Sequence, residues 1–140
     1  MKAFLYLYIG IARRHASWPA VSVDVESEFP SGAGLGSSAA YSVSLAAALM
    51  KGISGVEATR QVVSEWAFRC EHIFHGKPSG IDNSICSYGG AILFQAGDIT
   101  QEMRDVKSLR ALLVYTNVTR NTKRLVEQVS RRRERVRAST

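Results

Sequence analysis

The spacing of hydrophobic positions changes several times along the chain, and each spacing predicts a different element. An uninterrupted apolar run fills residues 3–12 and predicts a buried helix or strand, because periodicity alone does not distinguish the two. Farther on, Val21, Val23 and Val25 alternate with polar residues. This alternation predicts a half-buried strand that ends near Pro30, since proline cannot donate to a ladder.

The middle of the chain has a helical pattern. Residues 39–50 are rich in alanine and leucine, which favour a helix. A long amphipathic helix is predicted between Ser54 and Gly76, because apolar residues recur there every three or four positions. Ser54 and Glu57 have the spacing of a capping box at its start, and Gly76 with Pro78 ends it.

The last third alternates short apolar segments with turn residues. Residues 91–94 and 111–115 predict short buried strands, and residues 95–98 predict a turn. From Asn121 onward, the spacing of leucine, valine and charged residues predicts a helix. A mixture of strands and helices is typical of α+β or α/β proteins, and the pattern alone does not decide between them.

Composition and charge narrow the class of protein. The chain has 140 residues, 46% hydrophobic and 21% charged, which is enough for one domain with a core and argues against general disorder. The net charge of +6 comes mostly from arginines in residues 131–137. Such a segment can bind nucleic acid or an acidic membrane, or it can be a solvated helix end. No aromatic residues are interleaved there to stack on bases, which argues against nucleic acid as a partner. We expect no membrane partner either.

Two further features concern the compartment. Cys70 and Cys86 are too few for a disulfide framework or a zinc site, and we expect two buried or partly buried thiols in a reducing compartment. The apolar run of residues 3–12 is too short to cross a bilayer, which takes about 20 residues as a helix. Arginines follow this run in place of a small-residue cleavage site, which argues against a secretory signal.

A glycine-rich stretch between the predicted strand and helix is the strongest candidate for chemistry. Gly32, Gly34 and Gly36 allow the backbone to approach a ligand closely. Their amides and the positive end of the following helix can bind anionic oxygens. The hydroxyls of Ser37 and Ser38 follow at once, within reach of a phosphate or a bound Mg²⁺. The stretch therefore predicts a polyphosphate site.

Other interpretations of the stretch remain open. It is not a Walker A loop, because no Gly-Lys-Ser/Thr ending is present. It is a poor dinucleotide fingerprint, because Ser37 stands where a third glycine is needed. A plain glycine turn that joins strand to helix is the simplest alternative.

A second candidate site combines two carboxylates. Glu71 lies near the end of the long helix, eleven residues before Asp82, and the two could meet around a divalent ion or a substrate hydroxyl. Mg²⁺ is favoured by such oxygen ligands. Zinc at His72 and His75 is an alternative without a third ligand, and Asp82 could also be an ordinary turn residue.

Three separated segments resemble the GHMP small-molecule kinases. Residues 30–40 (PSGAGLGSSAA) are similar to the second signature of that family. Residues 75–83 (HGKPSGIDN) and residues 117–123 (NVTRNTK) are most similar to its mevalonate kinase branch. The similarity runs in register from about residue 2 to about residue 130.

The resemblance implies an α+β fold with the two-domain architecture of GHMP kinases. Residues 1–103 would form most of the N-terminal ATP-binding domain. Residues 104–140 would begin the C-terminal domain and end in a divergent basic tail. The Pro-Gly-Lys motif near the start of family members and the glycine-rich motif near their end have no match in this sequence, so we expect an incomplete catalytic centre.

The resemblance also implies roles for individual residues. Ser38 and Glu71 would hold Mg²⁺, and Asp82 would act as catalytic base or orient the substrate hydroxyl. Thr122 and Arg120 would approach the substrate. The residues expected around the ATP phosphates are Gly32, Ala33, Gly34, Leu35, Gly36, Ser37 and Ser38.

The implied reaction is transfer of the ATP γ-phosphoryl group to mevalonate, which gives 5-phosphomevalonate for isoprenoid and sterol synthesis. Family members are cytoplasmic and often homodimeric, and we expect the same of the parent enzyme. Two alternatives stay open. One is another GHMP kinase, such as a phosphomevalonate or galactose kinase. The other is a noncatalytic shortened form that binds nucleotide weakly or associates with the intact enzyme.

Overall fold

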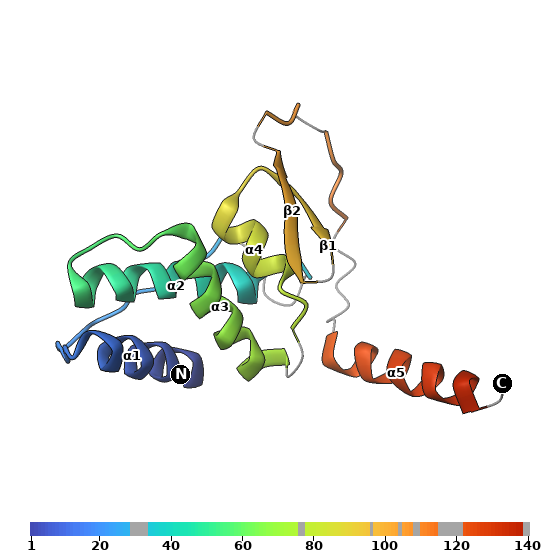
Figure 1. Ribbon diagram of the computed structural model, residues 1–140, viewed down its shortest axis with the longest axis horizontal. Helices are drawn as coiled ribbons and strands as arrows, with labels where there is room; N and C mark the ends of the chain where they lie inside the picture. Colours follow the sequence, from blue (N-terminus) through green and yellow to red (C-terminus); the bar gives the residue numbers. More distant parts are fainter. Residues whose placement is uncertain are drawn as a thin grey trace.

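A computed structural model describes residues 1–28, 34–75, 78–95, 97–103, 105–107, 110–114 and 122–138. Helices and a small antiparallel sheet together make the fold α+β, as expected (Figure 1). In chain order the elements are α1 (Lys2–His15), α2 (Ser37–Ser54), α3 (Arg60–His75), α4 (Ile81–Tyr88), β1 (Ala91–Gln95), β2 (Asp98–Met103) and α5 (Thr122–Ala138).

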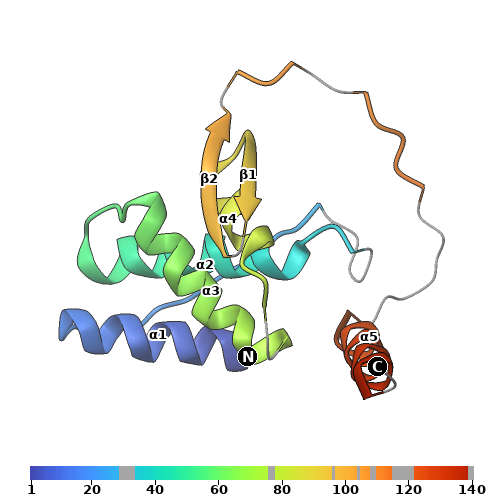
Figure 2. The ribbon, with the colours of Figure 1, turned by 45° about the vertical axis from the view of Figure 1, so that its right-hand side comes forward.

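Helix α1 forms from the first apolar run. Its buried residues, Ala3, Leu7, Ile11 and Ala12, recur at helical spacing and form one face. This face packs against α2 and α3 (Figures 1 and 2). The apolar run, which predicted either a helix or a strand, is therefore a helix with one buried face.

Helices α2 and α3 confirm the two predicted helices and form most of the core. The predicted capping box is wrong, because Ser54 is the last residue of α2, Glu57 pairs with Lys51, and α3 begins at Arg60. The buried apolar side chains come from α1, α2 and α3, and those of α2 and α3 include Leu45, Leu49, Met50, Ile53, Val63, Trp66 and Cys70. Gly10 of α1 lies against one of them. A Cβ at that position would lie 2.6 Å from Cζ3 of Trp66, so glycine allows α1 to approach α3 this closely.

Helix α4 and the β1–β2 hairpin lie together on one side of the helical layer in both views (Figures 1 and 2). β1 pairs antiparallel with β2, with Ala91 opposite Met103 and an irregularity between Leu93 and Phe94. β1 confirms the strand predicted at residues 91–94. The predicted domain boundary after residue 103 follows the last residue of β2 and stays a prediction.

Two predicted strands are wrong. Residues 20–28 have no regular secondary structure, and Val25 is 58% exposed. Residues 111–114 are also irregular, and Leu112 is 88% exposed; Tyr115 lies outside the described residues. A strand requires a neighbour for its backbone hydrogen bonds, and in the described part of the chain the only ladder joins β1 to β2. An alternating or apolar sequence pattern therefore does not form a strand without such a neighbour.

The prediction for the two thiols is half right. Cys70 is buried in α3, but Cys86 on α4 is exposed, and the buried residues of α4 are Asn83 and Ser84. In the described residues, no helix is both long enough and apolar enough to cross a membrane. α5 agrees with the helix predicted from Asn121.

Candidate functional site

The described end of the glycine stretch forms the N-terminus of α2. Gly34 and Gly36 have positive φ angles of 76° and 73°, a backbone region that suits glycine. The Gly36 carbonyl accepts the first helical hydrogen bond, from the Ala40 amide at 3.0 Å. The first turn of a helix leaves its amides without intrahelical partners and positive in potential, which favours an anion. Gly32 and Ala33 lie outside the described residues.

Glu71 brings a carboxylate to the same place from α3. The side chain is buried, with 4% of the residue exposed. The Ser38 hydroxyl donates to Oε2 at 3.5 Å, so the two residues expected to hold a metal are neighbours. Carboxylate and hydroxyl oxygens are ligands that suit a hard divalent cation.

Ser42 is a member of this group that sequence analysis missed. It is fully buried, and its hydroxyl lies 3.1 Å from Oε1 of Glu71 and 2.9 Å from the Ser38 carbonyl oxygen. Ser38 and Ser42 are one helical turn apart, so they share a face of α2. That spacing was the only sequence pattern that could have pointed to Ser42.

Asp82 approaches the glycine stretch from the first turn of α4. A Cβ placed on Gly36 would lie 3.9 Å from Cγ of Asp82, so the two residues are in contact range. A carboxylate in the first turn of a helix is stabilised by the helix dipole. Asp82 is exposed.

The buried side-chain amide of Asn83 links α4 to α3 by hydrogen bonds. Asn83 is 3% exposed, and its Nδ2 donates to the carbonyl oxygen and the hydroxyl of Ser64, at 3.2 and 3.0 Å. Because Asn83 follows Asp82 directly, this attachment fixes where Asp82 lies. The sequence pattern indicates no role for Asn83, because its partner Ser64 is 19 residues away along the chain.

Burial and nearby charges shift the pKa values of both thiols. Burial raises the pKa of Cys70, a hydrogen bond with Ser42 lowers it, and the negative charge of Glu71 raises it again. Desolvation also raises the pKa of Cys86, and the charges of Asp82 and then Glu71 add to that effect. The charges of Asp82 and Glu71 therefore both raise the pKa of the same thiol, Cys86.

The remaining predicted residues are less well placed. Arg120 lies outside the described residues, and of Thr122 only the position at the start of α5 is described. His72 lies edge-on against Phe68, with ring centroids 5.0 Å apart. Within the described ranges, no three His, Cys, Asp or Glu side chains form a group that could hold a metal ion.

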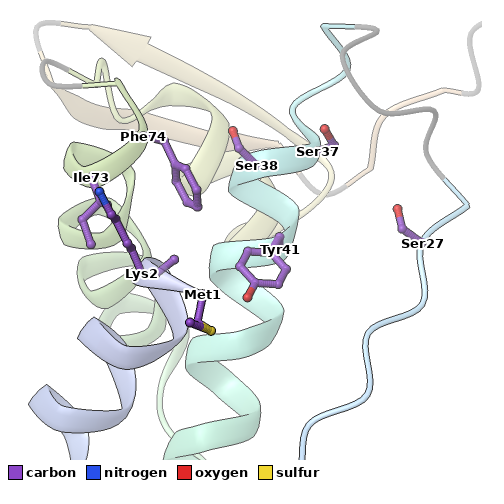
Figure 3. A pocket seen from close by; sticks show the side chains of 9 residues that line it. Met1, Lys2, Ser27, Ser37, Ser38, Tyr41, Ile73 and Phe74 are labelled. Atoms are coloured by element: carbon purple, nitrogen blue, oxygen red, sulfur yellow. The ribbon is translucent and has the colours of Figure 1, made fainter.

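A hollow of about 560 Å³ lies beside the N-terminus of α2, a size typical of small-molecule sites. Figure 3 shows Ser37, Ser38 and Tyr41 on α2, Phe74 at the end of α3 facing them, and Ser27 on the chain opposite. The full lining consists of Met1, Lys2, Ala3, Ser27, Ser37, Ser38, Tyr41, Ile73 and Phe74. Aromatic and hydroxyl groups thus line the wall next to the glycine stretch.

Comparison with known proteins identifies the family of this chain. Residues 3–90 match the model of the GHMP kinases N terminal domain. The chain is 44% identical to the mevalonate kinase of Mus musculus and 41% identical to that of Homo sapiens, in each case over 93% of this chain and 36% of the relative. It is 42% identical to the mevalonate kinase of Arabidopsis thaliana, over 94% of this chain and 36% of the relative.

The chain thus spans about a third of the length of these relatives. The matched residues 3–90 include Gly34, Gly36, Ser38, Ser42, Glu71 and Asp82. The chain belongs to the GHMP kinase family.

Proposed function

We propose that this chain supplies the phosphate-binding and aspartate-bearing part of a mevalonate kinase. The observation that carries the proposal is the convergence of the α2 N-terminus, the Ser38–Glu71 pair and Asp82 from three different helices. The relatives named above are mevalonate kinases, which favours mevalonate as the phosphoryl acceptor.

ATP would bind at the N-terminus of α2. The glycine stretch, from Gly32 to Gly36, and the amides of the first helical turn would bind the phosphate oxygens. The adjoining hollow is lined in part by the aromatic side chains of Phe74 and Tyr41, which suit an apolar, planar group such as the base. Ser37 would contribute its amide and hydroxyl at the entrance.

The donor set of this site suits Mg²⁺. Ser38 and Glu71 present a hydroxyl and a carboxylate from two packed helices, and both are hard oxygen donors. When bound, Mg²⁺ neutralises charge on the phosphates that would otherwise repel the attacking oxygen. Ser38 and Glu71 would hold it, and the buried position of Glu71 keeps its carboxylate in place.

Asp82 would bind the primary hydroxyl of mevalonate and accept its proton. The hydroxyl oxygen forms a bond to the γ-phosphorus while the bond from that phosphorus to the β,γ-bridging oxygen breaks. The products are 5-phosphomevalonate and ADP. Arg120 and Thr122 would complete the acceptor side, in a cytoplasmic and homodimeric parent enzyme of isoprenoid and sterol synthesis.

The test is phosphoryl transfer by the purified 140-residue chain, followed by ³¹P NMR with mevalonate, phosphomevalonate or galactose as acceptor. Of the three acceptors we expect transfer to mevalonate alone, and we expect it to be slow, because the chain spans about a third of the length of its relatives and its catalytic centre is incomplete. We expect Asp82→Asn to lower kcat by about 10²–10⁴, the usual effect of removing a general base, with ATP affinity unchanged. Glu57→Gln, a change on the surface away from the site, serves as the control.

Three results would count against the proposal. Transfer to galactose would assign a different member of the family. ATP binding without transfer would favour the noncatalytic alternative. Full activity of Asp82→Asn would remove Asp82 from the reaction.

A further inference from the structure

The packing of α2 on α3 encloses one serine that cannot reach a ligand itself. Ser42 is completely buried, while Ser38, one turn nearer the N-terminus of α2, is partly exposed. The Ser42 hydroxyl is closer to the Glu71 carboxylate than the Ser38 hydroxyl is, at 3.1 Å against 3.5 Å. We propose that Ser42 is a positioning residue that orients the Glu71 carboxylate for the metal–nucleotide complex.

The need for such a residue follows from the chemistry of glutamate. The last torsion of a glutamate side chain is broad and has no deep minima, so the carboxylate plane is set by its contacts. Ser42 engages Oε1, and Oε2 lies on the side of Ser38. Rotation of the carboxylate would break the bond to Ser42, so this bond holds Oε2 beside the Ser38 hydroxyl.

Ser42 is itself well fixed. It lies in the interior of the 18-residue helix α2, and its side chain has a single heavy-atom torsion. Its hydroxyl also lies 2.9 Å from the Ser38 carbonyl oxygen. The Cys70 thiol is a third partner of this hydroxyl. One proton cannot serve all three groups fully, and the ionised carboxylate is the strongest acceptor. The backbone contact also restrains the side-chain torsion of Ser42.

A hydroxyl is suited to this task because it is neutral. A buried carboxylate is destabilised unless it accepts hydrogen bonds. A lysine or arginine would supply them but would cancel the charge that attracts a cation. Ser42 stabilises the carboxylate and leaves its charge available.

This inference rests on the proposed function, because it assumes that Glu71 acts on a metal. The test therefore measures ATP binding without turnover, by calorimetry in Mg²⁺ and again in EDTA, on the whole chain. The EPR spectrum of Mn²⁺ with ATP reports the metal itself. The variants are Ser42→Ala, Ser42→Cys of similar size, and Ser42→Thr, which keeps the hydroxyl.

Ser54→Ala is the matched control. Ser54 lies on the same helix and donates to the carbonyl four residues back, the Met50 oxygen at 2.7 Å, but it lies at the other end of α2 from Glu71.

We expect Ser42→Ala and Ser42→Cys to weaken ATP binding in Mg²⁺ by about 10-fold or more, the usual effect of removing a group that orients a metal ligand. Binding in EDTA should stay unchanged, the Mn²⁺ spectrum should broaden, and Ser42→Thr should restore both. Ser54→Ala should match the wild type in each measurement.

The contrary outcomes separate the two proposals. If the wild-type chain binds ATP equally in Mg²⁺ and EDTA, the metal role of Glu71 fails and the inference on Ser42 fails with it. If the wild type depends on Mg²⁺ and both hydroxyl-free variants keep that dependence, only the inference on Ser42 is overturned. Equal losses in Mg²⁺ and EDTA would give Ser42 a purely structural role and also overturn it.

Discussion

The two ends of the α2–α3 contact have opposite chemistry. Toward the loop that joins the helices, the buried residues are apolar and include Leu49, Ile53 and Val63. Toward the N-terminus of α2, the same two helices meet through Ser38, Ser42 and Glu71. The hydrophobic effect stabilises the first end, whereas the second end buries a carboxylate that needs hydrogen bonds merely to be tolerated.

This difference indicates what each end is for. Apolar side chains of similar size at the polar end would stabilise the helix pair more, because a buried charge is unfavourable without full compensation. The chain instead places its buried polar group beside the glycine stretch and Asp82. We interpret the apolar end as the support and the polar end as the binding site that this support holds rigid.

The largest expected effect is at the apolar end. Leu49 is 3% exposed, so Leu49→Ala should lower the free energy of unfolding by about 2–5 kcal/mol through lost burial and a cavity. Urea denaturation followed by circular dichroism measures this. As the control, Lys51→Ala removes only an exposed ion pair with Glu57, and should change stability by at most about 1 kcal/mol. Similar effects of both variants would show that the apolar end does not hold the helices.

An intermediate effect is expected at the polar end, and on binding instead of stability. Glu71→Gln keeps the shape of the side chain and removes its charge. We expect ATP affinity in Mg²⁺ to fall about 10- to 100-fold, while the free energy of unfolding stays the same or rises, since a buried charge is lost. Calorimetry and urea denaturation measure the two quantities. A large loss of stability with intact Mg²⁺-dependent binding would make Glu71 part of the support.

The smallest effect concerns Cys70, which lies between the two ends. Its folded-state pKa is raised, chiefly by burial, so folding favours the protonated thiol. The contribution of this thiol to the free energy of unfolding is fully present below the pKa of the unfolded state, and it is lost as the pH rises above about 9. Cys70→Ala should therefore lose less stability than the wild type between pH 8 and 10, as measured by urea denaturation at each pH. Equal losses would show that the thiol is not held in its neutral form.

Local patterns predicted the helices of the core. The apolar spacing between Ser54 and Gly76 gave α3, and the alanines and leucines after the glycine stretch gave α2, because both depend on nearby residues. The alternation of Val21 to Val25 predicted a strand that the structure does not contain. A strand depends on a distant partner, and alternation does not reveal whether one is present.

The site was predicted in part for the same reason. The glycine stretch was visible as a motif, while the roles of Ser38, Glu71 and Asp82 came from the resemblance to the GHMP kinases. Ser42 and Asn83 were missed. Each is a single polar residue whose partner, Glu71 or Ser64, comes from another helix, and such a contact leaves no local pattern.

The measurement that tests the account most directly is a thermal melt of the purified chain alone, with ATP in EDTA, and with Mg²⁺-ATP. A ligand that binds only the folded state raises the melting temperature. We predict one cooperative transition that rises with ATP and rises further with Mg²⁺-ATP, because the glycine stretch and the Ser38–Glu71 pair each contribute to binding. A transition that is indifferent to both ligands would contradict the assignment of a nucleotide site to the N-terminus of α2.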